Sequence, residues 1–211
     1  MKFKQTLATG LLLTLVLIIF GCQSQNSSNK PLEEKQILEL SNNLLKNNSE
    51  VEKIGIESIK LSDYEHAPIN DKYYLTYHQY YKGLMAYNSE VYFVISGRGD
   101  VVNSIFKLYP NINVSTEAKI SEVEAIDIAQ KHLIDQNTSM FVQFKEKLGF
   151  EEVTRRARPE SATLIILPME KGEEFTYNLA WQTEFNVPLP KRVFVNAVNG
   201  EILKEEETYI S

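Results

Sequence analysis

The spacing of apolar residues predicts two helices. Residues 31–46 place isoleucine and leucine at intervals of three and four positions, and residues 121–135 repeat this spacing with alanine, isoleucine and leucine. Ser121 and Glu124 form a capping box at the start of the second stripe. Each helix therefore has one apolar face, which must be buried against another element.

Short apolar segments bounded by turn residues predict strands after each helix. The expected strands cover residues 54–61, 73–81, 91–95, 101–108, 164–167, 175–185, 193–198 and 201–206. The connections between them are too short for the crossovers that parallel strands require, so the strands pair as antiparallel hairpins. We expect an α+β fold of two cystatin-like units, each a helix packed on an antiparallel sheet, with residues 112–116 as the joint.

Residues 1–21 are expected to be a signal peptide that lies outside the fold. Two lysines precede an apolar run that is shorter than the roughly 20 residues of a membrane-spanning helix. Residues 19–22 (IFGC) resemble a bacterial lipobox, which implies that Cys22, the only cysteine, is acylated. Residues 22–30 are then a flexible tether to a membrane of the cell envelope, on its non-cytoplasmic side. The alternative is an uncleaved anchor followed by a free thiol.

Composition narrows the functional classes. Apolar residues make up 43% of the chain and charged residues 24%, the balance of a globular protein. The net charge of −6 argues against a nucleic-acid partner, which requires a basic surface. A single cysteine excludes a disulfide framework and any metal site built from several cysteines.

Several segments, in order, resemble the propeptide of thermolysin-like metallopeptidases, which consists of a fungalysin/thermolysin propeptide domain followed by a PepSY domain. The segments similar to the first domain are residues 77–84 (YHQYYKGL), 89–94 (SEVYFV) and 99–102 (GDVV). Those similar to PepSY are residues 121–129 (SEVEAIDIA), 179–182 (LAWQ) and 193–203 (VFVNAVNGEIL). The resemblance implies a first domain at 31–115 and a PepSY-like domain at 116–211.

The resemblance also implies a function. In that family the propeptide binds its own enzyme, assists its folding and blocks its cleft until it is removed. The sequence has no HExxH zinc motif, so we expect no enzymatic activity, cofactor, metal or small-molecule substrate. The expected partner is a secreted or envelope metallopeptidase, bound in trans. The alternatives are an envelope structural or interaction lipoprotein that reuses the fold, and the remnant of a truncated protease gene.

Two groups of residues are candidates for contact with the partner. They are an acidic tail with Glu205, Glu206, Glu207 and Tyr209, and an arginine cluster with Arg155, Arg156 and Arg158. We expect the acidic tail to follow the last strand toward the enzyme cleft, where its carboxylates could approach zinc or a basic rim; a solvated, frayed terminus is the alternative. The arginine cluster is either a solvated loop, a docking patch for an acidic surface or a protease-sensitive site.

Overall fold

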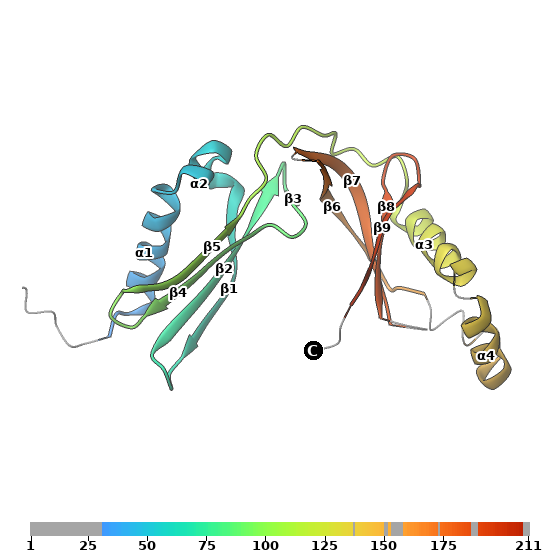
Figure 1. Cartoon of the computed structure of the whole chain (residues 1–211), viewed down its shortest axis with the longest axis horizontal. Coiled ribbons are helices and arrows are strands. Elements are labelled where there is room, and N and C mark those ends of the chain that lie inside the picture. The colour runs from blue at the N-terminus through green and yellow to red at the C-terminus, as the bar shows by residue number, and fades with distance from the viewer. Residues whose placement is uncertain are drawn as a thin grey trace, which may run out of the picture. The chain divides into compact units, whose positions relative to one another are not determined.

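The computed structural model describes residues 31–136, 138–149, 152, 158–172, 174–186 and 190–208. The elements of the first unit are α1 (Glu34–Lys46), α2 (Ser49–Ile54), η1 (Ile56–Ser58), β1 (Ile59–Ala67), β2 (Lys72–Tyr81), β3 (Leu84–Met85), β4 (Glu90–Ser96) and β5 (Val101–Lys107). Those of the second are α3 (Glu122–Gln136), α4 (Thr138–Leu148), β6 (Ala162–Lys171), β7 (Glu174–Phe185), β8 (Lys191–Asn196) and β9 (Ile202–Glu207). Both units carry helices and one antiparallel sheet, which confirms the predicted α+β class (Figure 1).

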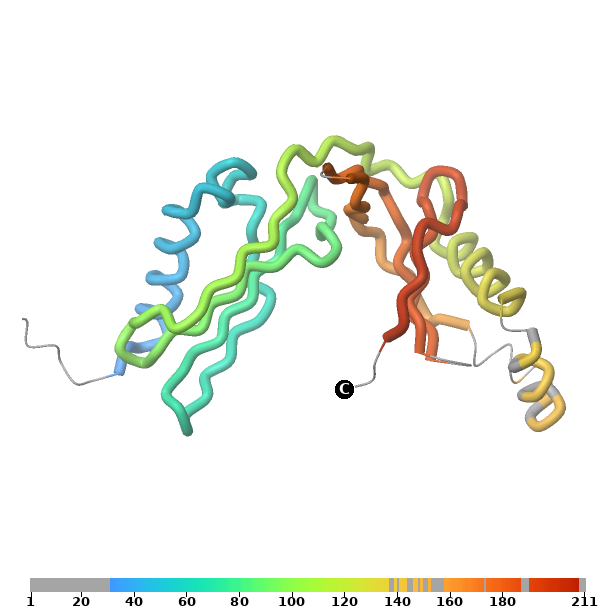
Figure 2. The backbone as a smooth tube through the Cα atoms, in the orientation of Figure 1, coloured from blue at the N-terminus to red at the C-terminus, as the bar shows by residue number. Residues whose placement is uncertain are grey.

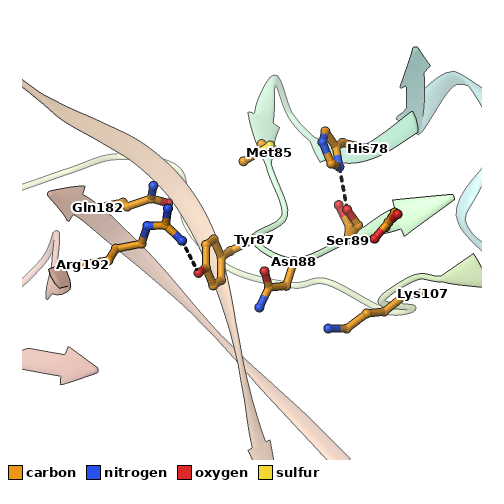
Figure 3. Close-up of a pocket in the computed structure, with 9 residues that line it drawn as sticks. His78, Met85, Tyr87, Asn88, Ser89, Lys107, Gln182 and Arg192 are labelled. Carbon is orange, nitrogen blue, oxygen red and sulfur yellow. Dashed lines mark hydrogen bonds between the residues drawn. The ribbon is translucent and has the colours of Figure 1, made fainter. Parts of the chain in front are cut away.

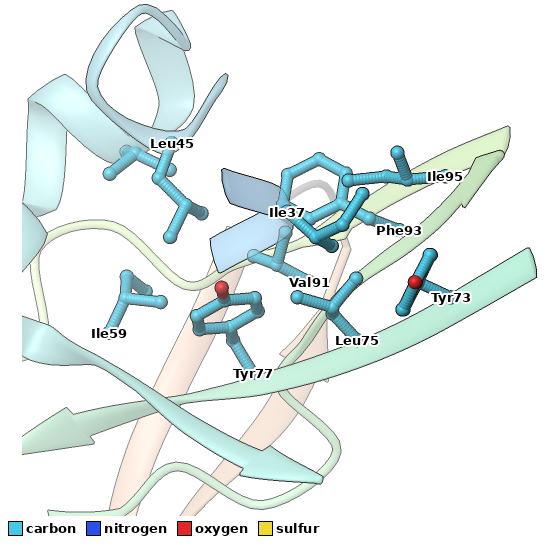
Figure 4. Close-up of a cluster of buried hydrophobic side chains, with 10 residues drawn as sticks. Ile37, Leu45, Ile59, Tyr73, Leu75, Tyr77, Val91, Phe93 and Ile95 are labelled. Atoms are coloured by element: carbon cyan, nitrogen blue, oxygen red, sulfur yellow. The ribbon is translucent and has the colours of Figure 1, made fainter. Parts of the chain in front are cut away.

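The first sheet has the strand order β1-β2-β4-β5, with the short strand β3 paired to β2. Helix α1 covers one face of it. Ile37 and Leu45 from this helix share a buried cluster with Leu75 and Phe93 from the strands (Figure 4). Alternation along β2 and β4 directs these strand residues toward the helix and their neighbours away from it.

The second sheet has the strand order β6-β7-β8-β9, and its successive strands follow one another along the chain (Figure 2). Helix α3 packs on one face through small and aliphatic residues, with Ala129 and Leu133 against Val193 and Val195. The predicted capping box is confirmed at the start of α3. The Ser121 N–H and hydroxyl both donate to the Glu124 carboxylate, and the Glu124 N–H donates back to the Ser121 oxygen.

One detail of the prediction was wrong, and one element was not predicted. Residues 54–58 are not strand, because Asn48 caps a second short helix, α2, by accepting hydrogen bonds from two backbone N–H groups of its first turn. The edge strand β1 consequently begins only at Ile59. The sequence analysis also placed no element after the second helix, where α4 extends to Leu148.

The second sheet is buried on both faces. Three consecutive residues of β6, Ile165 to Leu167, are fully buried, and so are the three residues from Val193 to Val195 in β8. Successive strand residues point to opposite faces, so α3 covers only every second one of them. The other face is covered partly by Tyr87, which belongs to the connection that follows β3 in the first unit.

Candidate partner-binding site

Residues 86–89, between β3 and β4, connect the first unit to the second sheet. Ala86 forms a parallel bridge with Ile166 of β6, and the Tyr87 N–H donates to the Ile166 carbonyl at 2.8 Å. The Tyr87 ring packs edge-to-face on Phe194 with 4.7 Å between ring centroids. Tyr87 is only 7% exposed, so this aromatic side chain is a core residue of the neighbouring unit.

The Tyr87 hydroxyl lies between a carboxylate and a guanidinium. It donates to Glu206 of β9 at 2.5 Å and accepts from Arg192 of β8 at 2.7 Å. Arg192 also donates through two nitrogens to Glu184 of β7, at 2.9 and 2.5 Å. With the backbone bond to Ile166 included, Tyr87 is hydrogen-bonded to β6, β8 and β9 of the second unit and, through Arg192, is linked to β7.

A second clamp holds the chain where it leaves the first sheet. The Gln79 side chain, 3% exposed, donates to the Tyr109 carbonyl and accepts from the Tyr109 N–H, both at 2.8 Å. The next residue, Pro110, accepts a hydrogen bond from the Tyr177 hydroxyl of β7 at 2.6 Å. The side-chain amide of Gln79 therefore makes the two hydrogen bonds to the Tyr109 backbone that a neighbouring strand would otherwise make.

An open pocket of about 340 Å³ lies beside the Tyr87 network (Figure 3). Its lining includes His78, Tyr87, Asn88, Lys107, Gln182 and Arg192. The Gln182 Oε1 atom is buried and has no hydrogen-bond partner among the described residues. Leaving such a buried acceptor unpaired costs about 1–3 kcal/mol.

The acidic residues predicted at the carboxyl terminus belong to the sheet. The expected last strand at 201–206 is confirmed, since β9 runs to Glu207 and pairs with β8, and the expectation that a tail beyond this strand begins at Glu205 was therefore wrong. Glu205 contacts Lys191 and accepts from His132 of α3 at 3.0 Å. Glu206 binds Tyr87 and, at 2.5 Å, Lys204. Of the three acids, only Glu207 is classed as exposed.

The remaining predicted site residues are divided. Arg158 donates to Asp127 of α3 at 2.5 Å and to Gln130 at 3.3 Å, which fastens the segment before β6 to the helix. Such an exposed ion pair contributes little to stability. The other candidates, Cys22, Arg155, Arg156 and Tyr209, lie outside the described residues.

The sequence analysis missed Tyr87, Arg192 and Gln79. Gln79 had a detectable signal, because it is the only amide at an inward position of an otherwise aromatic strand. Tyr87 lies in a connection with no periodicity, and the partners of its hydroxyl are more than 100 residues away in sequence. No local pattern reports a contact of that kind.

The described residues hold no group of three or more histidine, cysteine, aspartate or glutamate side chains that could bind a metal ion. Across the same part of the chain, no helix is long and apolar enough to span a membrane.

Comparison with known proteins gives few matches. No family model matches the chain, and no curated protein does. One solved structure that aligns with it is the C-terminal domain of YpeB from Bacillus megaterium. The alignment covers 86% of this chain and 67% of that chain, with 13% sequence identity and a TM-score of 0.37. A similarity of this size assigns neither a family nor a function.

The ion pairs of β9 make the stability of the fold depend on pH. Burial acts to raise the pKa of Glu206, but hydrogen bonds from Lys204 and Tyr87 outweigh it and lower the pKa below its ordinary value of 4.5. Burial likewise opposes the bonds from Lys191 and His132 that lower the pKa of Glu205. A carboxyl whose pKa is lowered on folding stabilises the fold above its unfolded pKa, and this contribution is lost as pH falls through the folded value.

We predict that Glu206→Gln flattens the acid side of the stability profile. The variant keeps an acceptor for Tyr87 but has no proton to gain, so its free energy of unfolding should fall less than that of the wild type between about pH 5 and about pH 3. At neutral pH the lost charge-assisted bonds should cost about 1 kcal/mol. Urea unfolding followed by Trp181 fluorescence measures both quantities. Glu207→Gln, at the exposed end of the same strand, should follow the wild type; equal acid slopes for wild type and Glu206→Gln would contradict the assignment.

Proposed function

We propose that this chain is a lipid-anchored, non-catalytic protein that binds a secreted thermolysin-like metallopeptidase in trans and inhibits it or assists its folding. The observation that best supports the proposal is the succession of two helix-on-antiparallel-sheet units. The propeptide that the sequence resembles has two modules in this order, a fungalysin/thermolysin propeptide domain and then a PepSY domain. The units proposed to correspond to them are residues 31–115 and 116–211.

A protein that binds a folded enzyme through preformed surfaces gains affinity when those surfaces are already ordered, because little entropy is lost on association. Two features supply such order here. The Tyr87 side chain is anchored in the second sheet, and the Gln79 amide fixes the backbone at Tyr109. Both features favour a preorganised binding protein over a flexible linker region.

The acidic strand β9 is the proposed contact with a basic rim of the enzyme. Glu205 and Glu206 form ion pairs with Lys191 and Lys204 within the fold. These pairs hold the strand in place, and they partly neutralise the two carboxylates. Glu207 is exposed beside them and is the acid best placed to meet a cation of the partner. The proposed contact is therefore narrower than the acidic tail from Glu205 onward that the sequence analysis considered.

A second candidate function is an envelope lipoprotein that holds another polypeptide without involvement of a protease. The exposed aliphatic side chains of β5 favour it, because surfaces of this kind are typical of protein–protein contacts. Crosslinking in intact cells followed by purification of the lipoprotein separates the two candidates: a metallopeptidase in the crosslinked product supports the first, and an envelope assembly component supports the second.

The binding proposal predicts an effect on peptidase activity. The purified full-length protein, in detergent, should at micromolar concentration slow peptide hydrolysis by thermolysin-like peptidases secreted by the same cell, or raise the yield of active enzyme on refolding. Phe93→Ala, which removes a fully buried ring of the first unit and should cost about 3–5 kcal/mol, is the unfolded control. Neither inhibition nor improved refolding with any of these enzymes would contradict the proposal.

The anchoring proposal predicts that Cys22→Ala abolishes lipid attachment. Cells fed an alkyne-labelled fatty acid should label the wild-type protein and retain it in the membrane fraction, whereas the variant should be unlabelled. Each chain on the cysteine stabilises attachment by about 0.8 kcal/mol per buried methylene, so several chains hold the protein firmly. A wild-type protein that stays in the membrane fraction without label would support the uncleaved anchor instead.

A further inference from the structure

The edges of the two sheets differ in how they are protected. An edge strand exposes unpaired backbone N–H and C=O groups, and proteins usually shield them with charges, proline or bulges. Three edges follow this rule. The exposed face of β1 carries Lys60, Asp63 and Glu65, β6 contains Pro168, and β9 has four consecutive charged residues from Lys204 to Glu207.

Strand β5 is the least protected of the four edges, because its only protection is one bulge at its start, at Val102. Within the described residues it pairs with β4 alone, and no charge or proline interrupts it from Val101 to Phe106. Its register with β4 is irregular only at the start, between Val101 and Asn103, and is unbroken from there to Lys107. Three of its aliphatic side chains are exposed: Val101 at 42%, Val102 at 52% and Ile105 at 45%.

One exposed side chain of β5, Ile105, continues an aromatic strip across the sheet. Ile105 lies opposite Tyr92 of β4, and the Tyr92 ring stacks on Tyr74 of β2 with 6.4 Å between centroids. Tyr74 and Tyr92 alternate with core residues along their strands, so the strip lies on the face of the sheet opposite α1. A strand added beside β5 would place one of its side chains directly opposite Ile105, on the same face of the sheet, and would so extend the strip by one residue.

We propose that the free edge of β5 binds an extended, uncharged segment of another polypeptide by strand addition, with β-branched or aromatic side chains at alternate positions. The row of unpaired backbone groups requires a partner in the extended conformation, and the strip sets the character of its side chains. A second copy of this chain is disfavoured as the occupant, since each copy carries a net charge of −6. The binding mode applies whether or not the partner is a peptidase.

The test is selection from a display library of random nine-residue peptides against the full-length protein in detergent. The selected peptides should be uncharged with alternate apolar residues, and fluorescence anisotropy should show at least about tenfold weaker binding to Ile105→Lys. Leu61→Lys is the matched control, because Leu61 is 42% exposed on the opposite edge strand, and it should bind as the wild type does.

Three results would overturn the proposal. One is the absence of any enriched peptide, and another is binding that Ile105→Lys and Leu61→Lys weaken equally. The third is a concentration-dependent dimer of the wild-type protein that Ile105→Lys dissolves, because a second copy would then fill the edge. Light scattering detects the dimer, and Trp181 fluorescence verifies that both variants are folded. If peptides bind but the protein has no effect on peptidases, the β5 binding site is supported and only the proposed enzyme partner is contradicted.

Discussion

The insertion of Tyr87 into the second sheet is the contact on which the rest of the molecule depends. Its ring completes an apolar cluster with Ile165, Ala180 and Phe194, so one face of that sheet is finished by a residue of the other unit. Its hydroxyl lies between Arg192 and Glu206 and adds a hydrogen bond to each of these partly buried charged groups. Burial and, to a smaller extent, the hydrogen bond to Glu206 together raise the pKa of Tyr87 to about 12, so the phenol stays protonated under physiological conditions. The contact thus combines apolar burial with directional bonds.

This contact explains features that a single helix-on-sheet unit would not need. Strands β6 and β8 of the second sheet are apolar on both faces, because α3 covers one face and the segment around Tyr87 covers part of the other. The buried Gln79 amide holds the chain after β5 by its hydrogen bond to the Tyr109 carbonyl. Before α3, the Ile120 carbonyl accepts a hydrogen bond from the Trp181 ring at 2.8 Å. Together these bonds order the chain between the two units, which is what a protein that binds through preformed surfaces requires.

The elements with strong local signals were predicted correctly, and those that depend on distant contacts were not. The capping box at Ser121 and the aromatic run of β2 are read directly from neighbouring residues, and both elements are present. The start of β1 was missed because Asn48 is equally suited to ending one helix and capping the next. Tyr87 was missed for a different reason. Its contact with Glu206 spans 119 positions, and the two residues meet only when the folded segment around Tyr87 lies against the second sheet.

The central structural claim is that the two units fold as one body through Tyr87. Hydrogen exchange measured by mass spectrometry over a urea series tests it most directly, because it reports β4 of the first unit and β8 of the second separately. Both strands of the wild-type protein should lose protection at the same urea concentration, and Tyr87→Ala should separate the two transitions. Two separate transitions in the wild-type protein, unchanged by Tyr87→Ala, would contradict this claim.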